Sequence, residues 1–140
     1  MRRVVIDTNV YIDWLNAGRY EAVLFEADAV KYLSAVVLME LYAGTFSPRD
    51  IRLVRGIASA FKRADRILVP TGQVYEDAGE VLRGLQSAGF RIEGRHSLVN
   101  DILIALSARS IGATVFTQNE RDFAIIHRIR PFKLAIVPTV

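Results

Sequence analysis

Short apolar runs rich in β-branched residues alternate with longer helical patterns along the whole chain. The runs expected to form strands are Arg3–Ile6, Lys31–Leu33, Ile67–Val69, Thr114–Thr117 and Lys133–Val137. Strands that alternate with helices form a parallel sheet with helices on both faces. We therefore expect an α/β protein, built as a three-layer α/β/α sandwich around a central, mostly parallel sheet. The length fits a single domain over residues 1–140.

Capping residues and glycines mark the expected helices. These are Val10–Leu15, Glu21–Ala27, Val36–Ala43 capped by Ser34, a helix from Ser47 to about Ala64, one from Thr71 to Ala88, one from Ser97 to about Ile111, and Glu120–Ile126. Serine and threonine at these starts supply N-cap oxygens, and Pro48 after Ser47 suits a first helical turn.

The composition narrows the chemistry that the chain can perform. It contains no cysteine, which excludes disulfides, thiolate zinc sites and thiol nucleophiles. Its two histidines, His96 and His127, are too few for most zinc sites. A bound metal would need oxygen ligands, which favours Mg²⁺ or Mn²⁺. No apolar run approaches the roughly 18 residues of a membrane span, so we expect a cytoplasmic protein with no membrane contact.

The net charge is a modest +3, but 15 of the 18 basic residues are arginine. Arginine suits bidentate contact with phosphate. If several acids gather in one pocket, a basic body around it would attract a polyanion. Genome composition or salt-bridged helices explain the arginines equally well, so the charge alone decides nothing.

Four carboxylates stand in apolar surroundings. They are Asp7 after Val4–Ile6, Glu40 as the one charge in Val36–Ala43, Asp101 as the one charge in Ser97–Ala108, and Asp122 after Thr114–Thr117. The helix of Glu40 is apolar on nearly every side, so we expect it to be buried. An unpaired buried carboxylate is costly. No lysine or arginine lies within a helical turn of Glu40, so its partner is distant in sequence or is a metal.

Asp7 and Asp122 lie near the carboxyl ends of predicted strands, where parallel sheets form their sites. Asp101 is expected near the first turn of its helix, where the helix dipole favours an anion. Taken singly, each acid has an ordinary explanation as a cap, a dipole partner or an ion-pair partner. Taken together, two of them still need their burial explained. Their neighbours Thr8, Asn9, Thr117 and Asn119 are short polar residues of the kind that orient ligands and water.

These motifs, in this order, resemble the PIN-domain family. The matching segments are Val5-Ile6-Asp7-Thr8-Asn9-Val10, Glu40 in its apolar helix, Asn100-Asp101-Ile102-Leu103-Ile104-Ala105, and Val115-Phe116-Thr117-Gln118-Asn119-Glu120-Arg121-Asp122-Phe123. The chain looks most like the VapC-type toxins of bacterial and archaeal toxin–antitoxin pairs. Position 119 is asparagine where some members carry an acid, and Asp122 fills the fourth acidic position.

The resemblance implies a function and a set of roles. Asp7, Glu40, Asp101 and Asp122 would form the metal-binding catalytic cluster, and Thr117 would help to position water or an acid. It further implies Mg²⁺ or Mn²⁺ dependence, endonucleolytic cleavage of RNA, homodimers, and a VapB-like antitoxin that blocks the site.

The chemistry is consistent with that set of residues. Clustered carboxylates alone would repel an anionic phosphodiester, so they require divalent cations. We hypothesise that Asp7 and Asp101 bind metal directly and that Glu40 binds it directly or through water. Asp122 would complete the cluster, with a second metal if one binds.

Arg91, Arg95 and His96 precede the helix of Asp101 in a glycine-containing loop and could grip RNA phosphates. Solvated loop charges are the alternative reading. Arg49, Arg52 and Arg55 recur along one helix and could form a nucleic-acid, antitoxin or solvated face.

Other classes of protein remain to be weighed. A phospho-acceptor signalling domain would need an aspartate after a middle strand and a lysine after the last, whereas Asp101 lies within a helix and Lys133 precedes its strand. A catalytically silent PIN-like scaffold for RNA or a partner, a housekeeping RNA-processing nuclease, and a nuclease that acts on DNA stay open. Nothing in the sequence specifies the RNA target.

Overall fold

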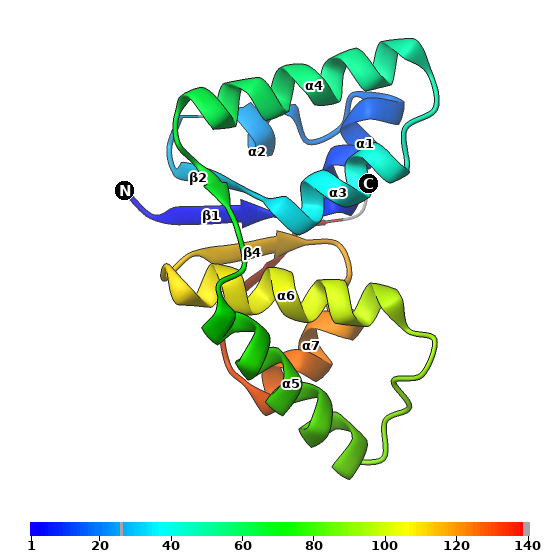
Figure 1. Cartoon of the computed structure of the whole chain (residues 1–140). Helices are drawn as coiled ribbons and strands as arrows, with labels where there is room; N and C mark the ends of the chain where they lie inside the picture. The colour runs from blue at the N-terminus through cyan, green and yellow to red at the C-terminus, as the bar shows by residue number, and fades with distance from the viewer. Residues whose placement is uncertain (26, 139–140) are drawn as a thin grey trace.

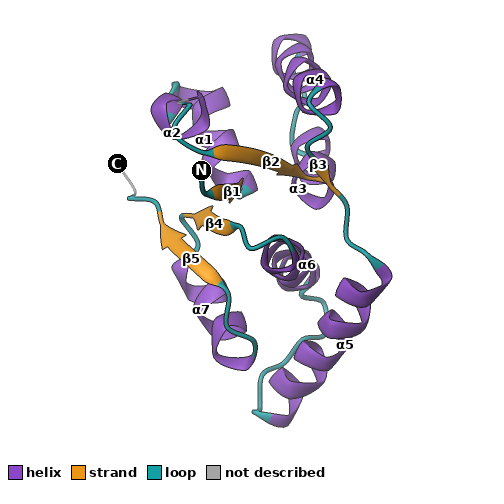
Figure 2. Ribbon diagram, turned by 90° about the vertical axis from the view of Figure 1, so that its left-hand side faces the viewer, coloured by secondary structure: helices purple, strands orange, loops and turns teal. Residues whose placement is uncertain are grey.

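The computed structural model describes residues 1–25 and 27–138 of the chain. The strands are β1 (Arg3–Ile6), β2 (Val30–Ser34), β3 (Ile67–Leu68), β4 (Thr114–Thr117) and β5 (Lys133–Ile136). The helices are α1 (Thr8–Ala17), α2 (Glu21–Phe25), α3 (Ala35–Ala43), α4 (Pro48–Arg63), α5 (Gly72–Ser87), α6 (His96–Ser110) and α7 (Glu120–Ile129). Helices α1 to α4 cover one face of the sheet and α5 to α7 the other (Figures 1 and 2). The α/β/α sandwich expected from the sequence is confirmed.

The five strands lie in the order β3-β2-β1-β4-β5, and each pairing among the described residues is parallel. The chain winds outward from β1 to β3, then returns to place β4 and β5 on the other side of β1. The winding reverses between β1 and β4, where parallel sheets open a crevice at their carboxyl ends. Ile6 pairs with Phe116, and the Asp7 backbone N–H donates to the Phe116 carbonyl at 2.8 Å. The residues that follow β1 and β4 therefore meet at this crevice.

Helix α6 runs through the middle of the lower layer, beneath the sheet (Figure 1). Its residues from Asp101 to Ala108 are all buried. A helix that is apolar on every side is stable only when protein surrounds it, and α5, α7, α3 and β4 all contact α6. This burial fixes the position of Asp101, the one charged residue in the buried stretch.

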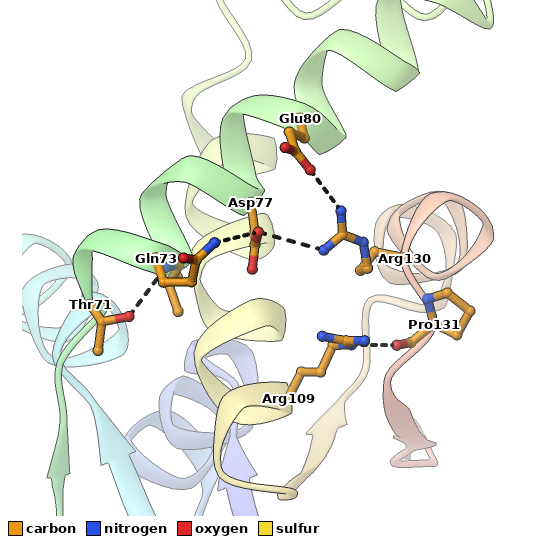
Figure 3. Close-up of polar contacts among 8 residues, drawn as sticks. Thr71, Gln73, Asp77, Glu80, Arg109, Arg130 and Pro131 are labelled. Atoms are coloured by element: carbon orange, nitrogen blue, oxygen red, sulfur yellow. Dashed lines mark hydrogen bonds and ion pairs between the residues drawn. The ribbon is translucent and has the colours of Figure 1, made fainter.

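Helix α7 is held against α5 by polar contacts, which Figure 3 shows, and by an apolar contact. Arg130 donates to the Glu80 carboxylate at 3.1 Å and lies 3.7 Å from Asp77. A Cβ atom built on Gly84 of α5 would lie 3.1 Å from Cγ2 of Ile129, so the glycine permits this approach. These contacts hold the C-terminal end of α7 to α5.

Two helix starts differ from those expected. Helix α1 begins at Thr8 rather than Val10, because the Asp7 carboxylate caps it and accepts from the Thr8 N–H at 2.8 Å. Ser97 was expected to cap the next-to-last helix, but α6 begins at His96, and Arg95 takes the cap position without a side-chain hydrogen bond. Asp101 consequently lies in the second turn, past the end where the helix dipole acts most strongly. Ser34, Ser47 and Thr71 are confirmed as N-caps.

Helix α3 is not buried on nearly every side as expected, because Met39 is 54% exposed and Tyr42 41% exposed. Strand β3 ends at Leu68, and α7 continues past Ile126 to Ile129. Helix α2 ends at Phe25, and its expected extension crosses residue 26, which is outside the described residues. None of the described helices combines the length and the apolar character that crossing a membrane requires.

Replacing Gly84 tests the close approach of α5 and α7. Gly84→Val would force Ile129 away from a position only 3.1 Å from the added Cβ, so we expect a loss of about 1–3 kcal/mol in the free energy of unfolding. Gly79→Ala on the same helix is the matched control, since a Cβ there meets nothing within 4 Å. The control should stabilise the protein by roughly 0.5–1 kcal/mol, because alanine restricts the unfolded chain more than glycine does. Urea unfolding measures both, and a Gly84→Val protein as stable as the wild type would contradict the tight packing.

Candidate functional site

Asp7 lies at the centre of the crevice between β1 and β4. It is 4% exposed, and both carboxylate oxygens are held by donors. The Thr8 N–H donates to Oδ1 at 2.8 Å, and the Thr117 hydroxyl donates to Oδ2 at 2.7 Å. These two hydrogen bonds fix the orientation of a buried carboxylate.

Thr117 connects several of the polar residues that the sequence singled out. Its Oγ1 accepts from the Asn119 backbone N–H at 2.9 Å and from the Asn9 side-chain amide at 3.4 Å. The Asn9 side-chain oxygen in turn accepts from the Gln118 N–H at 3.3 Å. The start of α1 and the end of β4 are therefore fastened together around Asp7.

Glu40 reaches the same crevice from α3, on the opposite side of the sheet from α6. It is half-buried, and its partners are neutral donors. The Thr8 hydroxyl donates to Oε1 at 2.6 Å and the Asn100 amide to Oε2 at 3.4 Å. The partner is thus distant in sequence, as expected, but Glu40 is less deeply buried than the sequence indicated.

Asp101 approaches from α6 and is 7% exposed. The Asn119 side-chain amide lies 3.4 Å from Oδ2 of Asp101 and 3.2 Å from Oδ2 of Asp122. Asn119 also caps α7, because its side-chain oxygen accepts from the Asp122 N–H. One asparagine therefore links the two acids of the lower layer.

Asp122 differs from the other three acids because an arginine neutralises it. Arg95 donates from a terminal guanidinium nitrogen to Oδ1 of Asp122 at 3.0 Å. Arg91 and His96, the other residues considered for RNA contact, are exposed. Of the three, the structure brings Arg95 into the acid cluster.

An open pocket of about 320 Å³ lies over the crevice. We call it the acid pocket; its lining residues are Asp7, Thr8, Asn9, Ile12, Asp13, Glu40, Ser97, Asp101 and Asn119. Three of the four expected acids line it, whereas Asp122, which contacts Arg95 and Asn119, is not among the lining residues.

Sequence reasoning missed two residues of this site. Asp13 lines the acid pocket and accepts from the Gln118 side-chain amide at 2.8 Å. It follows Asn9 by one helical turn, so the four-residue spacing could have placed both on one face of α1. Asn100 was quoted as part of a motif, but its contact with Glu40 was not anticipated.

The pocket raises the pKa of its buried acids. Burial is the main cause at Asp101, whose pKa rises from 3.8 to about 8, and repulsion from Asp7, Asp122 and Glu40 adds to it while Arg95 lowers it. Burial also raises the pKa of Asp7, although hydrogen bonds from Thr117 and Thr8 oppose the shift. Without a cation, the pocket therefore retains a proton near neutral pH.

The donors of the pocket suit a hard divalent cation, since they are carboxylate, hydroxyl and amide oxygens. Asp7, Glu40 and Asp101 would hold the cation, because all three line the acid pocket and their carboxylates carry negative charge that a cation would balance. As the side chains stand, no three acidic or histidine residues among those described converge tightly enough to hold an ion. The chemistry therefore fits a cation, and binding would require the carboxylates to turn toward it from their present hydrogen bonds.

Among the described residues, the sheet is fully parallel and its carboxylates gather at the switch point, which defines the class as an α/β protein with an acidic site at the carboxyl ends of its strands. The sequence matches the family model of the PIN domain over residues 4–128, so the chain belongs to the PIN domain family. PIN domains are in general nucleases that use divalent metal ions. The resemblance found from the sequence is confirmed.

Solved structures support the same assignment. The chain is similar to one in the DNA-bound VapBC complex from Salmonella typhimurium, with a TM-score of 0.71, 25% identity, and coverage of 97% of this chain and 98% of that one. It is also similar to chains of VapBC2 from Rickettsia felis (TM-score 0.69, 23% identity, 97% and 99% covered) and VapBC-5 from Mycobacterium tuberculosis (TM-score 0.61, 24% identity, 99% and 100% covered). No curated protein sequence matches the chain significantly. The structural likeness supports a VapC-type PIN fold.

The raised pKa of Asp101 predicts how stability depends on pH in the absence of metal. The folded protein binds this proton more tightly than the unfolded chain does, so its stabilising effect is complete below pH 3.8 and is lost as the pH rises through about 8. In EDTA, we expect Tm to fall as the pH rises from about 4 to about 8. Asp101→Asn should reduce that fall, because an amide does not ionise. Equal pH dependence in the wild type and the variant would contradict the raised pKa.

Proposed function

We propose that the chain is a metal-dependent endoribonuclease that hydrolyses RNA phosphodiester bonds, and that it is the toxin of a VapBC-type pair. The observation that carries the proposal is the acid pocket, in which Asp7, Glu40 and Asp101 meet at the switch point of a PIN domain. Burying these acids is costly unless a cation offsets their charge. The chain also belongs to the PIN domain family, whose members are in general nucleases.

Each residue takes a role that follows from its contacts. Asp7 and Asp101 would bind Mg²⁺ or Mn²⁺ directly, since they are the most buried acids. Glu40 would bind it directly or through water, because it is half-buried and held by Thr8. Asp122 would complete the cluster from the side of α7. Thr117 would keep Asp7 oriented through its 2.7 Å hydrogen bond, with Thr8, Asn9 and Asn119 as supporting residues.

The reaction is a hydrolysis. Water adds its oxygen to phosphorus, the P–O bond to one sugar breaks, and the strand is left with one phosphate end and one hydroxyl end. A bound divalent cation lowers the pKa of water and offsets charge on the phosphate. The carboxylates hold the site, while the basic groups Arg91, Arg95 and His96 are proposed contacts for the RNA backbone.

Partners follow from the same proposal. The similar chains come from structures described as VapBC complexes, which supports a VapB-like antitoxin as the partner of this chain. A second pocket of about 300 Å³, with an apolar lining that includes Leu24, Ile57 and Phe61, offers a place for an apolar segment. A homodimer, a cytoplasmic location and a single domain over residues 1–140 remain parts of the proposal. Co-expression with the product of an adjacent small gene tests the antitoxin, which should co-purify and suppress cleavage.

Asp7→Asn tests the proposed activity. The amide keeps the size of the side chain but removes its charge, so we expect Mg²⁺- or Mn²⁺-dependent RNA cleavage to fall by at least about a hundredfold while the circular dichroism spectrum is unchanged. Asp65→Asn is the matched control: Asp65 is exposed, and its φ of 54° is one that asparagine adopts readily. The control should cleave like the wild type.

Parallel assays on RNA and DNA of the same sequence separate the alternatives. Full activity in folded Asp7→Asn would remove this residue from the site. A wild-type chain that binds RNA but cleaves neither substrate would favour a silent scaffold, and preferential DNA cleavage would favour a deoxyribonuclease. Cleavage of RNA by a chain with which no antitoxin co-purifies would favour a housekeeping nuclease.

A further inference from the structure

The ion pair between Arg95 and Asp122 divides the acid cluster into two parts. Asp7, Glu40 and Asp101 line the acid pocket, whereas Asp122 is covered on one side by Arg95 and on the other by Asn119. Among the described residues, Arg95 is the one cation that pairs with any of the four acids. The free protein thus supplies a positive charge of its own to the fourth acid.

The geometry of the Arg95–Asp122 ion pair allows Arg95 to dissociate from Asp122. A single guanidinium nitrogen contacts a single carboxylate oxygen at 3.0 Å, and the Arg95 side chain is 36% exposed while that of Asp122 is 15% exposed. Pairs that are partly open to water contribute little to stability, so breaking this one is inexpensive. A phosphate offers arginine two oxygens in a bidentate arrangement, which is stronger than the present contact.

The position of the loop supports exchange between these two anions. Arg95 follows Gly94, whose φ of 72° lies in the left-handed region, and it immediately precedes α6. Ser97, two residues later, lines the acid pocket. The loop that carries Arg95 therefore borders the acid pocket, although Arg95 itself is not one of the lining residues. Once it leaves, Asp122 remains one side chain from Asp101, because Asn119 contacts both carboxylates.

We propose that Arg95 is an exchangeable counter-ion, which neutralises Asp122 in the free protein and moves to an RNA phosphate when substrate binds, leaving Asp122 available to a divalent cation. This inference rests on the proposed nuclease function and adds to it the order in which RNA and the second cation bind. The free protein holds a cation weakly at Asp122, and RNA strengthens that binding. Arg95 is thus a positioning residue for Asp122 and a binding residue for RNA.

Binding of Mn²⁺ to the metal-free full chain tests the first half of the inference. Titration followed by the electron paramagnetic resonance signal of free Mn²⁺ compares the wild type with Arg95→Gln. We expect Arg95→Gln to bind Mn²⁺ roughly tenfold more tightly or to take up an additional ion, because a positive charge beside the acids is removed. Arg95→Lys should bind like the wild type, since it retains the charge.

Arg121→Gln is the matched control for a general change in charge. It removes an exposed arginine next to Asp122 in sequence and leaves the Arg95 pair in place. This variant should bind Mn²⁺ nearly as the wild type does. Unchanged Mn²⁺ affinity in folded Arg95→Gln would overturn the proposal, and so would an equal gain in Arg121→Gln, which would show that total charge alone sets the affinity.

RNA kinetics test the second half. In Arg95→Gln, we expect KM for RNA to rise with a smaller change in kcat, while the Mn²⁺ concentration for half-maximal rate falls. The slope of RNA affinity against salt should decrease by about one, as expected for one lost phosphate contact. An unchanged KM and salt slope would overturn the transfer of Arg95 to phosphate. A wild-type chain that binds no Mn²⁺ would contradict the proposed function itself, whereas Mn²⁺ binding that is indifferent to Arg95 would contradict this inference alone.

Discussion

Repulsion between buried carboxylates is the constraint around which this fold is arranged. Asp7 and Asp101 are almost fully enclosed, and like charges at such depth are costly unless donors or cations offset them. Hydrogen-bond donors offset part of that cost. Thr8 and Thr117 donate to Asp7, and the Asn119 amide contacts both Asp101 and Asp122. Asp7 stands between β1 and α1, and α3, α6 and α7 supply the other three acids, so the packing of all these elements maintains the cluster. These hydrogen bonds hold the buried carboxylates in place, and the raised pKa values of Asp7 and Asp101 reflect the remaining cost of their charge.

Local signals in the sequence were sufficient to predict the architecture and to single out the acids, three of which line one pocket. Strand and helix periodicities, together with the caps Ser34, Ser47 and Thr71, are readable from neighbouring residues alone. The acids stood out because each was an isolated charge in apolar company, and because the carboxyl ends of parallel strands share one edge of the sheet. Convergence of Asp7, Glu40 and Asp101 could therefore be expected before any coordinates were known.

Features that depend on tertiary contact were not predictable in this way. The start of α6 was misplaced, since Ser97 has the local character of a cap but the helix begins at His96. The apolar sequence of α3 indicated burial on nearly every side, yet the helix exposes Met39 and Tyr42. The pairing of Arg95 with Asp122 joins residues on different elements, and no pattern near either one reveals it. Asp13 was within reach of helical spacing, but nothing local distinguished it from a solvated acid.

The order of the sheet has a consequence for how such a protein is synthesised. The crevice lies between β1 and β4, so its two walls come from segments far apart in the sequence; Asp7 and Thr117, which hydrogen-bond across it, are 110 residues apart. A nascent chain that has not yet delivered β4 to the ribosomal exit carries Asp7 and Glu40 without Thr117, Asn119 or Asp122 beside them. If the finished protein cleaves RNA, the messenger and the ribosome that produce it are exposed to an incomplete, inert enzyme during most of translation. On that condition, the translating machinery meets a complete site only after the last strands have closed the sheet.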